Sequence, residues 1–180
     1  MLAALYLSLF LPSAIASASN DCVYVLYVET GSVENAGTHA KISVVIGDIH
    51  GREMKVNDLK SWGLMGSSYK YFQKGKIDSF GGRGACLNGP PCHLKIASDY
   101  SGACPSWYCD VVEVTATGPH DSTTQTIFYV NQWFSKDRPP YQLSTARDYC
   151  YNMVEAGEHG RLGMLLVGNP LGRLQSPASQ

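Results

Sequence analysis

The chain has 180 residues, a formal net charge of −1 and no long block of either sign. Proteins that bind nucleic acid need a basic patch or stripe to meet the phosphate backbone, so this composition argues against a nucleic-acid partner. With 44% hydrophobic residues, a chain of this length can bury a sizeable core. We therefore expect one globular domain.

The first 18 residues form an uncharged and largely apolar segment. Its centre reads LAALYLSLFL over residues 2–11, and the small residues Ala16, Ser17 and Ala18 fit the A-x-A pattern of a signal-peptidase site. An apolar run of about ten residues is short for a membrane span, which needs about 20. We expect residues 1–18 to be a cleaved secretory signal. The mature chain then enters the secretory pathway, in the endoplasmic reticulum or the extracellular space, without a transmembrane segment.

Short segments with strand periodicity follow, separated by polar turns. In residues 41–46 the side chains of Ile42, Val44 and Ile46 point to one side, which is the period of a half-buried strand. The predicted strands of the first half are residues 22–28, 41–46 and 53–56. They are joined by turns at 34–41 (ENAGTHAK) and 48–51, and a loop over 57–66 follows.

The second half has the same organisation. We expect extended chain over 69–80, 92–98, 107–116 and 124–134, with Gly- and Pro-rich breaks at 81–84 and 88–91 and a turn at 117–122. No segment before residue 140 has a helical period, and seven or eight short strands indicate an antiparallel sandwich. We predict an all-β fold, an antiparallel β-sandwich over residues 19–150. Residues 151–180 are expected to be a poorly ordered C-terminal extension, with a short docked helix as the alternative.

The six cysteines all follow the expected signal: Cys22, Cys86, Cys92, Cys104, Cys109 and Cys150. An even number in a secreted chain indicates disulfides. We expect Cys22–Cys150 to join the two ends of the domain, and the local pairs Cys86–Cys92 and Cys104–Cys109 to fasten loops. A zinc site made of the four middle cysteines and His93 is the alternative. The C-x5-C and C-x4-C spacings and the oxidising compartment argue against it.

No catalytic motif is present. Nucleophilic catalysis needs a nucleophile, a base and an orienting group close together, and the chain has no G-x-S-x-G elbow. His50, His93 and His120 fall on expected turns or solvent-facing strand positions. The glycines of residues 81–84 lack the Gly-Lys-Ser/Thr of a phosphate-binding loop. We predict that the protein has no catalytic residues and is not an enzyme.

Loops at the ends of a sandwich are the usual binding sites of such folds. The candidate residues are Glu34, Asn35 and His39 of the ENAGTHAK turn, Trp62 of the next loop, and Tyr100 of the loop over 99–105. An exposed tryptophan can enter a bilayer interface or a partner's pocket, which makes Trp62 the main aromatic candidate. Trp107 and Trp133 lie within predicted strands and are expected in the core.

Five segments, in order, resemble the PLAT/LH2 domain family. Residues 30–38 (TGSVENAGT) resemble its T-G-x-x-x-x-A-G-T pattern, and residues 72–80 (FQKGKIDSF) resemble its F-x-x-G-x-x-D-x-F pattern. Residues 94–102, 107–114 and 128–134 resemble the strands and turn that follow. The signal segment and six cysteines are similar to the small plant secretory group of ATS3-like and stress-associated PLAT proteins.

This resemblance implies a fold and a class of function. The fold is a C2-like sandwich of two four-stranded antiparallel sheets. Outside lipoxygenases and lipases, the domain is a binding module for membranes or proteins. We expect a non-enzymatic module that acts through its loops on a protein partner or weakly on lipid, in plant stress response or seed development. The alternatives are an accessory subunit of a lipid-acting enzyme and a calcium-independent module that binds membrane lipid.

The chain departs from the calcium-binding members of the family. In those members an Asp follows A-G-T, an Asn-Asp pair precedes F-x-x-G, and an acid precedes the motif Trp. Here these places hold His39, Lys70-Tyr71 and Ser106, and Gln73 stands where an acid is common. Calcium needs about six to eight oxygen ligands that usually include carboxylates. The carbonyls of Gly37 and Thr38 alone would not hold the ion, so we expect weak or absent calcium binding and no cofactor.

The tip of the ENAGTHAK turn departs in a second way. Membrane-inserting members carry large apolar residues there, whereas this chain has Glu34 and Asn35. Each such replacement gives up about 1.5–3 kcal/mol of apolar burial. Membrane insertion through this loop is therefore disfavoured.

Overall fold

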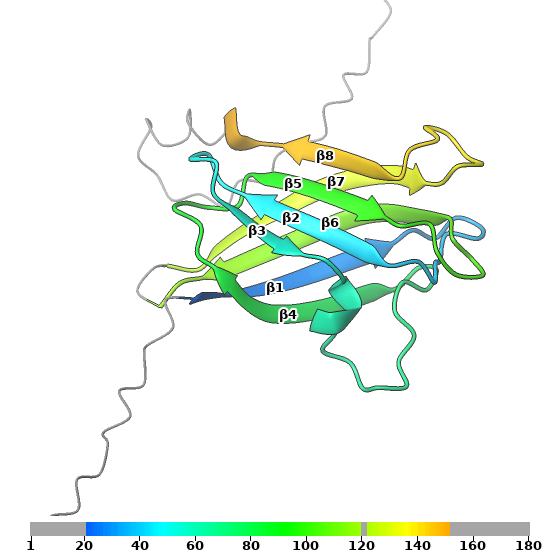
Figure 1. Cartoon of the computed structure of the whole chain (residues 1–180), viewed down its shortest axis with the longest axis horizontal. Helices are drawn as coiled ribbons and strands as arrows, with labels where there is room; N and C mark the ends of the chain where they lie inside the picture. The colour runs from blue at the N-terminus through cyan, green and yellow to red at the C-terminus, as the bar shows by residue number, and fades with distance from the viewer. Residues whose placement is uncertain (1–20, 120–121, 152–180) are drawn as a thin grey trace, which may run out of the picture.

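The computed structural model describes residues 21–119 and 122–151. The expected signal over 1–18, and the expected extension beyond Tyr151, lie outside the described residues. The described chain forms β1 (Asp21–Thr30), β2 (Ile42–Gly47), β3 (Glu53–Val56), the 3₁₀ helix η1 (Leu59–Trp62), β4 (Ile77–Ala85), β5 (His93–Ser98), β6 (Trp107–Thr117), β7 (Thr124–Phe134) and β8 (Ser144–Asp148) (Figure 1).

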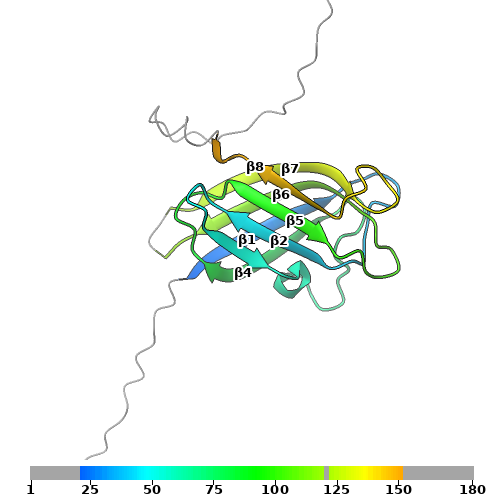
Figure 2. The ribbon, with the colours of Figure 1, turned by 45° about the horizontal axis from the view of Figure 1, so that its top comes forward.

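The strands form two antiparallel sheets stacked as two layers (Figure 2). One sheet has the order β4-β1-β6-β7, and we call it sheet A; the other has the order β3-β2-β5-β8, and we call it sheet B. The predicted sandwich of two four-stranded antiparallel sheets is confirmed. No helix among the described residues is long and apolar enough to cross a membrane.

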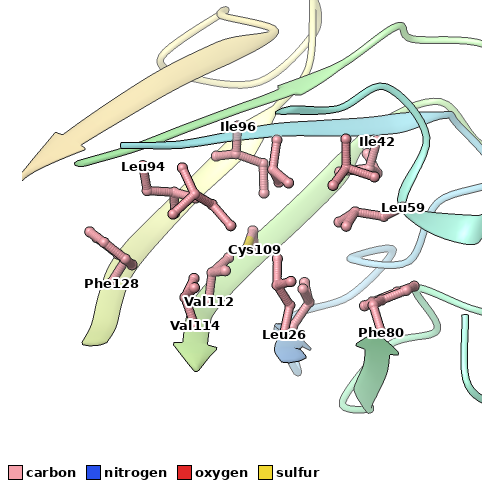
Figure 3. Packing of buried hydrophobic residues seen from close by; sticks show 14 of the residues in the cluster. Leu26, Ile42, Leu59, Phe80, Leu94, Ile96, Cys109, Val112, Val114 and Phe128 are labelled. Carbon is pink, nitrogen blue, oxygen red and sulfur yellow. The ribbon is translucent and has the colours of Figure 1, made fainter. Parts of the chain in front are cut away.

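Alternation along the strands builds the core between the sheets. In β1 every second side chain is buried, and the same holds for β3 and β5. Inward residues of both sheets meet in one apolar cluster, which Figure 3 shows with Leu26, Val112 and Phe128 on one layer and Ile42 and Ile96 on the other. Trp107 is fully buried as expected, whereas Trp133 is only half-buried.

The connections divide the molecule into two ends. Because neighbouring strands are antiparallel, the connections over 31–41, 57–76, 99–106 and 135–143 all lie at one end, which we call the loop end (Figure 1). The opposite end carries the start of β1 and the end of β8. Both disulfides lie there, and we call it the disulfide end.

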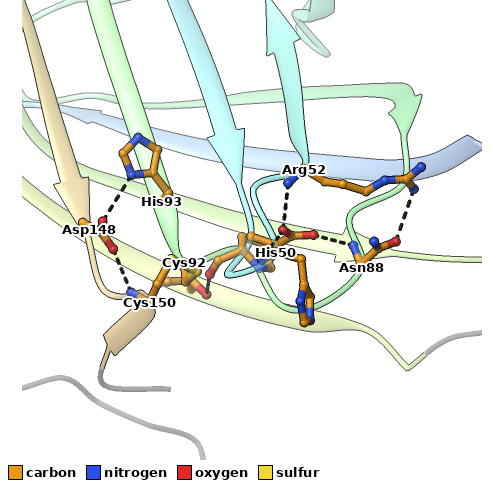
Figure 4. The surroundings of a disulfide bond; sticks show 10 residues. His50, Arg52, Asn88, Cys92, His93, Asp148 and Cys150 are labelled. Atoms are coloured by element: carbon orange, nitrogen blue, oxygen red, sulfur yellow. Dashed lines mark hydrogen bonds and ion pairs between the residues drawn. A yellow bond between two sulfur atoms is a disulfide. The ribbon is translucent and has the colours of Figure 1, made fainter. Parts of the chain in front are cut away.

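The predicted disulfide pairing is wrong. The structure joins Cys22 to Cys86 and Cys92 to Cys150. Strand register explains both bonds: Asp21 pairs with Ala85, and His93 pairs with Asp148, which brings the adjacent cysteines together. Figure 4 shows the second of these bonds, Cys92–Cys150. The order of the cysteines in the chain does not reveal these two bonds, because the pairing depends on which strands are neighbours in the sheets.

The pair Cys104–Cys109 is also not formed. Cys104 is exposed in the β5–β6 loop, while Cys109 is buried on the inward face of β6 (Figure 3). The Cys104 carbonyl accepts hydrogen bonds from the Thr38 hydroxyl and the His39 N–H, which hold the loop against the β1–β2 connection. The two thiols therefore face different environments.

Strand β4 begins and ends later than predicted. Extended chain was expected over 69–80 with a break at 81–84, but β4 runs from Ile77 to Ala85 and includes the glycines. Gly82 lies under the Trp62 ring, so a Cβ at this position would come within 2.5 Å of it. The glycines serve to admit a covering side chain rather than to end the strand.

Strand β8 was not predicted, because its sequence STARD has no apolar alternation. Its side chains nevertheless complete the neighbouring edge. Arg147 donates hydrogen bonds to the carbonyl oxygens of Tyr129 and Val130, and the Tyr149 hydroxyl accepts one from the Tyr129 N–H. Arg147 of β8 and Tyr149 just after its end thus pair with the free edge of β7 in sheet A.

Candidate functional site

The β1–β2 connection is built on Gly37 and Thr38. Gly37 passes so close to the backbone of Phe72 that a Cβ would lie 2.9 Å from the Phe72 carbonyl oxygen. Thr38 is buried, and its hydroxyl donates to the Cys104 carbonyl at 2.8 Å and accepts from the Ala40 N–H at 3.0 Å. The A-G-T segment therefore joins three loops, which is a structural role.

His39 lies at the surface of this connection with an exposed side chain. Its N–H donates to the Cys104 carbonyl. Gly102, with a φ of +83°, passes beside it, and a Cβ there would lie 2.9 Å from the Cβ of His39. The backbone around His39 is fixed while the imidazole faces solvent.

Lys60 of η1 reaches across to the same connection. Its Nζ donates to the carbonyl oxygens of His39 at 3.0 Å and Ala40 at 3.3 Å, and lies 5.6 Å from the centroid of the Phe72 ring. The position of Lys60 is set by the helix N-cap, because the Asp58 carboxylate accepts from the Lys60 N–H. An ammonium group therefore binds two outward carbonyls of the loop.

The F-x-x-G-x-x-D-x-F segment is held by its buried aspartate. The Asp78 carboxylate accepts from the Phe72 N–H at 2.5 Å and from the Tyr69 hydroxyl at 2.8 Å. This fixes a turn in which Phe72 has a φ of +59° and packs in the core. Hydrogen bonding to the ionised carboxylate raises the pKa of the Tyr69 hydroxyl. Both carboxylate oxygens of Asp78 thus accept hydrogen bonds from groups of the same chain.

Tyr100 joins the β5–β6 loop to the β7–β8 loop. Its hydroxyl donates to the Asp137 carboxylate, and the Nζ of Lys136 lies 5.0 Å from its ring centroid. Asp99 next to it has a lowered pKa, chiefly because of a hydrogen bond from the Ser101 side chain, with backbone N–H groups of Ser101 and Lys41 also contributing. The predicted candidate Tyr100 is half-buried and ties two loops together.

Glu34 and Asn35 lie exposed at the tip of the connection, as predicted from the sequence. Asn35 has a φ of +60° and lines a shallow depression of about 380 Å³. The other lining residues are Gly37, Cys104, Pro105, Ser106, Asp137 and Arg138. The structure therefore brings Asn35 and His39 of the β1–β2 connection and Tyr100 of the β5–β6 loop to the same end of the domain.

The prediction that Trp62 is an exposed loop tip is wrong. Trp62 is half-buried, packs against the core cluster and covers Gly82 of β4. The exposed apolar residues of this loop are Leu64 and Met65, with exposed fractions of 59% and 45%. Neither residue was predicted from the sequence, because a tryptophan in a loop is the stronger signal for a binding tip. Burial over a glycine was not visible in the sequence.

Comparison with known proteins identifies the family. The model for Embryo-specific protein 3 (ATS3) matches residues 9–138. PLAT domain-containing protein 1 of Arabidopsis thaliana is 42% identical over 141 residues, which cover 77% of this chain and 78% of that protein. PLAT domain-containing protein 2 of the same plant is 41% identical over 153 residues, covering 81% and 84%. The chain belongs to the PLAT domain family.

Solved structures agree with this PLAT fold. The coral 8R-lipoxygenase, described as calcium-activated via a C2-like domain, has 20% sequence identity and a TM-score of 0.53. The match covers 70% of this chain and 16% of the lipoxygenase chain. At this identity the likeness concerns the fold alone. The PLAT chain thus corresponds to about one sixth of the lipoxygenase.

The contacts of Lys60 bear on calcium binding at the loop end of this PLAT domain. The carbonyls of His39 and Ala40, which follow Gly37 and Thr38 in the connection, already accept hydrogen bonds from the Lys60 ammonium. A cation placed beside them would face another positive charge, which at about 4 Å costs roughly 4 kcal/mol per pair of unit charges near a protein surface. Within residues 21–119 and 122–151, no group of three or more His, Cys, Asp or Glu side chains could hold a metal.

The zinc alternative is excluded by the disulfides. Cys86 and Cys92 are bonded to Cys22 and Cys150, at the opposite end of the domain from Cys104. At the disulfide end, His93 lies 3.8 Å from the Asp148 carboxylate, and Asp48 accepts from the N–H groups of His50, Arg52 and Asn88 (Figure 4). These contacts order turns, and they bring no nucleophile to His93.

Proposed function

We propose that this PLAT domain is a non-catalytic binding module of the plant secretory pathway that engages a protein partner without calcium. The observation that carries the proposal is the Lys60 ammonium on the carbonyls of His39 and Ala40. A bound metal would order such a loop by drawing its carbonyl oxygens together. Here a lysine of the same chain makes those contacts, which supports a loop end that needs no ion.

The setting is supported by the disulfides and the relatives. Disulfides form and persist in oxidising compartments, and the chain has two, Cys22–Cys86 and Cys92–Cys150. The closely matching PLAT domain-containing proteins come from Arabidopsis thaliana. The name Embryo-specific protein 3 favours a role in seed development, and a role in stress response is the other setting that we propose.

Calorimetry with Ca²⁺ tests the proposal. We expect no binding heat and no change in melting temperature when Ca²⁺ replaces EDTA for the full mature chain. Lys60→Met should lower the free energy of unfolding by about 1–3 kcal/mol, because two carbonyls lose a charged hydrogen-bond donor. The matched control Lys55→Met removes an exposed lysine of β3 and should leave stability unchanged within about 0.5 kcal/mol. Stoichiometric Ca²⁺ binding by the wild-type chain would refute the proposal.

Calcium-independent lipid binding is the second candidate, and Leu64 and Met65 favour it. These exposed apolar side chains lie in a preformed turn, because the Met65 N–H donates to the Tyr71 hydroxyl at 2.8 Å. Exposed Lys70 follows in the same loop. Apolar side chains beside a lysine suit the interface of an anionic bilayer. Loss of vesicle binding in Leu64→Ser/Met65→Ser would support this candidate over the protein partner.

A further inference from the structure

The outward faces of the two sheets differ in chemistry. Outward positions of sheet A carry a group of exposed aromatic and aliphatic side chains. Their exposed fractions are 60% for Ile77, 41% for Tyr27, 40% for Tyr129 and 39% for Val23. The half-buried Val25, Val111 and Ile127 lie between them on the same face. An apolar group of this kind on one face marks an interaction site more often than scattered single residues do.

Sheet B has the ordinary polar outer face of a solvated antiparallel sheet. Its outward positions carry charged or titratable side chains, among them Glu53, Lys55, His93, Lys95 and Asp148. The inward residues of both sheets belong to one apolar core. The difference between the sheets is therefore a difference between their outward faces. The asymmetry lies wholly on the solvent side.

Strand register places two carboxylates inside the apolar face of sheet A. One row across the sheet reads Ile77, Glu29, Val111, Tyr129, and the next reads Ser79, Tyr27, Glu113, Ile127. Glu29 and Glu113 are diagonal neighbours on adjacent strands, about 7–8 Å apart. Gln125 donates a hydrogen bond to the Glu113 carboxylate. Two carboxylates therefore lie among the aromatic and aliphatic side chains of this face, and the exposed Asp21 and Arg83 lie on the same face nearer the disulfide end.

We propose that the outward face of sheet A docks a partner protein whose contact surface is apolar with a lysine or arginine at its centre. The inference rests on the proposed function and names the class of partner. The basic side chain meets Glu29 and Glu113, while apolar groups cover Tyr27 and Tyr129. Strands about 4.8 Å apart and about nine residues long give a face of roughly 15 Å by 30 Å. That flat area, roughly 450 Å², is about half of one side of a standard interface.

The same charges argue against two other occupants. An anionic bilayer would be repelled by the carboxylates of Glu29 and Glu113. A second copy that met this face with the same face would bring like charges together at the centre. A basic protein surface is the occupant that fits the charge as well as the apolar area.

NMR with two peptide probes tests the docking face. The ¹⁵N-labelled mature chain, with its disulfides intact, is titrated with acetyl-Trp-Arg-Trp-amide and with acetyl-Trp-Glu-Trp-amide at millimolar concentration. We expect the arginine peptide to shift the amides of Tyr27, Glu113 and Tyr129, and the glutamate peptide to bind several-fold more weakly. Glu29→Gln/Glu113→Gln should weaken the arginine peptide by roughly 2- to 30-fold. Lys55→Gln/Lys95→Gln on sheet B should leave it unchanged, and each spectrum reports whether its variant is folded.

Several results would overturn the inference. These are shifts confined to the loop end or to sheet B, equal affinity for both peptides, or no shifts at all. Self-association in ultracentrifugation that Tyr27→Ser abolishes would assign the face to a second copy and also overturn it. None of these results bears on calcium, which calorimetry decides separately, so a failure of the docking face can be told apart from a failure of the proposed function.

Discussion

Single polar side chains at the loop end are bound by the chain itself. The Thr38 hydroxyl, the Asp78 carboxylate and the Lys60 ammonium each contact backbone groups of a neighbouring segment. Buried or half-buried polar groups are costly unless they are paired. Pairing within the chain stabilises the loops, and Glu34, Asn35 and the His39 ring are among the groups of this connection that still face solvent.

The carboxyl group of Asp110, in contrast, is destabilised in its charged form by burial. It lies beside Tyr108 at the irregular start of β6, and burial raises the pKa of its carboxyl. A raised pKa means that the folded state holds the proton to higher pH than the unfolded state does. This contribution to stability is present below the unfolded pKa of about 3.9 and is lost as pH rises through the folded pKa.

Asp110→Asn should therefore stabilise the domain at neutral pH. We expect its gain in unfolding free energy over the wild type to grow as pH rises from about 4 to 7. Urea denaturation at several pH values measures this. A gain that is the same at pH 4 and pH 7 would show that titration of Asp110 is not its cause.

At the scale of elements, η1 and the turn after it cover the free edge of β4. The Leu64 N–H donates to the Ser79 carbonyl, Gly63 pairs with Phe80, and Trp62 lies over Gly82. A covered edge cannot pair with a strand of another molecule. The glycines of β4 are what permit the Trp62 ring to approach.

Gly82→Ala should displace Trp62 and destabilise the domain. The added Cβ would lie 2.5 Å from the ring, and overpacking of this kind costs about 1–3 kcal/mol. Chemical denaturation followed by tryptophan fluorescence measures the loss. The control Gly66→Ala adds a methyl group where no atom lies within 4 Å. An equal loss in both variants would contradict the packing of Trp62 on β4.

Strand periodicity predicted most of the fold, and tertiary neighbours decided the rest. β3 and β7 were predicted with their observed bounds, because apolar residues alternate along them. β8 was missed because its contribution is made by Arg147, whose partners lie on β7. Of the candidate site, the loops were predicted but Lys60 was not, since it is 21 positions from His39 in sequence. No local pattern reports a contact of that kind.

At the scale of the whole molecule, the two ends differ in redox chemistry. Both disulfides lie at the disulfide end, where one joins β1 to the chain just after β4 and the other joins the chain just before β5 to the chain after β8. The two remaining thiols are the exposed Cys104, in the β5–β6 loop, and the buried Cys109, in β6. Burial raises the pKa of the Cys109 thiol well above its usual value, which makes it a poor nucleophile.

Thiol titration should distinguish the exposed Cys104 from the buried Cys109. With Ellman's reagent we expect one thiol to react in the native protein, Cys104, and two to react after denaturation without reductant. Cys104→Ser should remove the native reaction and leave one thiol in the denatured chain. No reactive thiol in the denatured wild type would show that Cys104 and Cys109 are bonded to each other, as the sequence had suggested.

Calcium independence is the claim on which the proposed function depends, and vesicle co-sedimentation tests it most directly. The full mature chain is mixed with phosphatidylserine–phosphatidylcholine vesicles in EDTA or in Ca²⁺, and the pelleted fraction is measured. Because Lys60 already binds the carbonyls of His39 and Ala40, we expect the same pelleted fraction in both conditions. Pelleting of the protein in Ca²⁺ that EDTA reverses would contradict calcium independence.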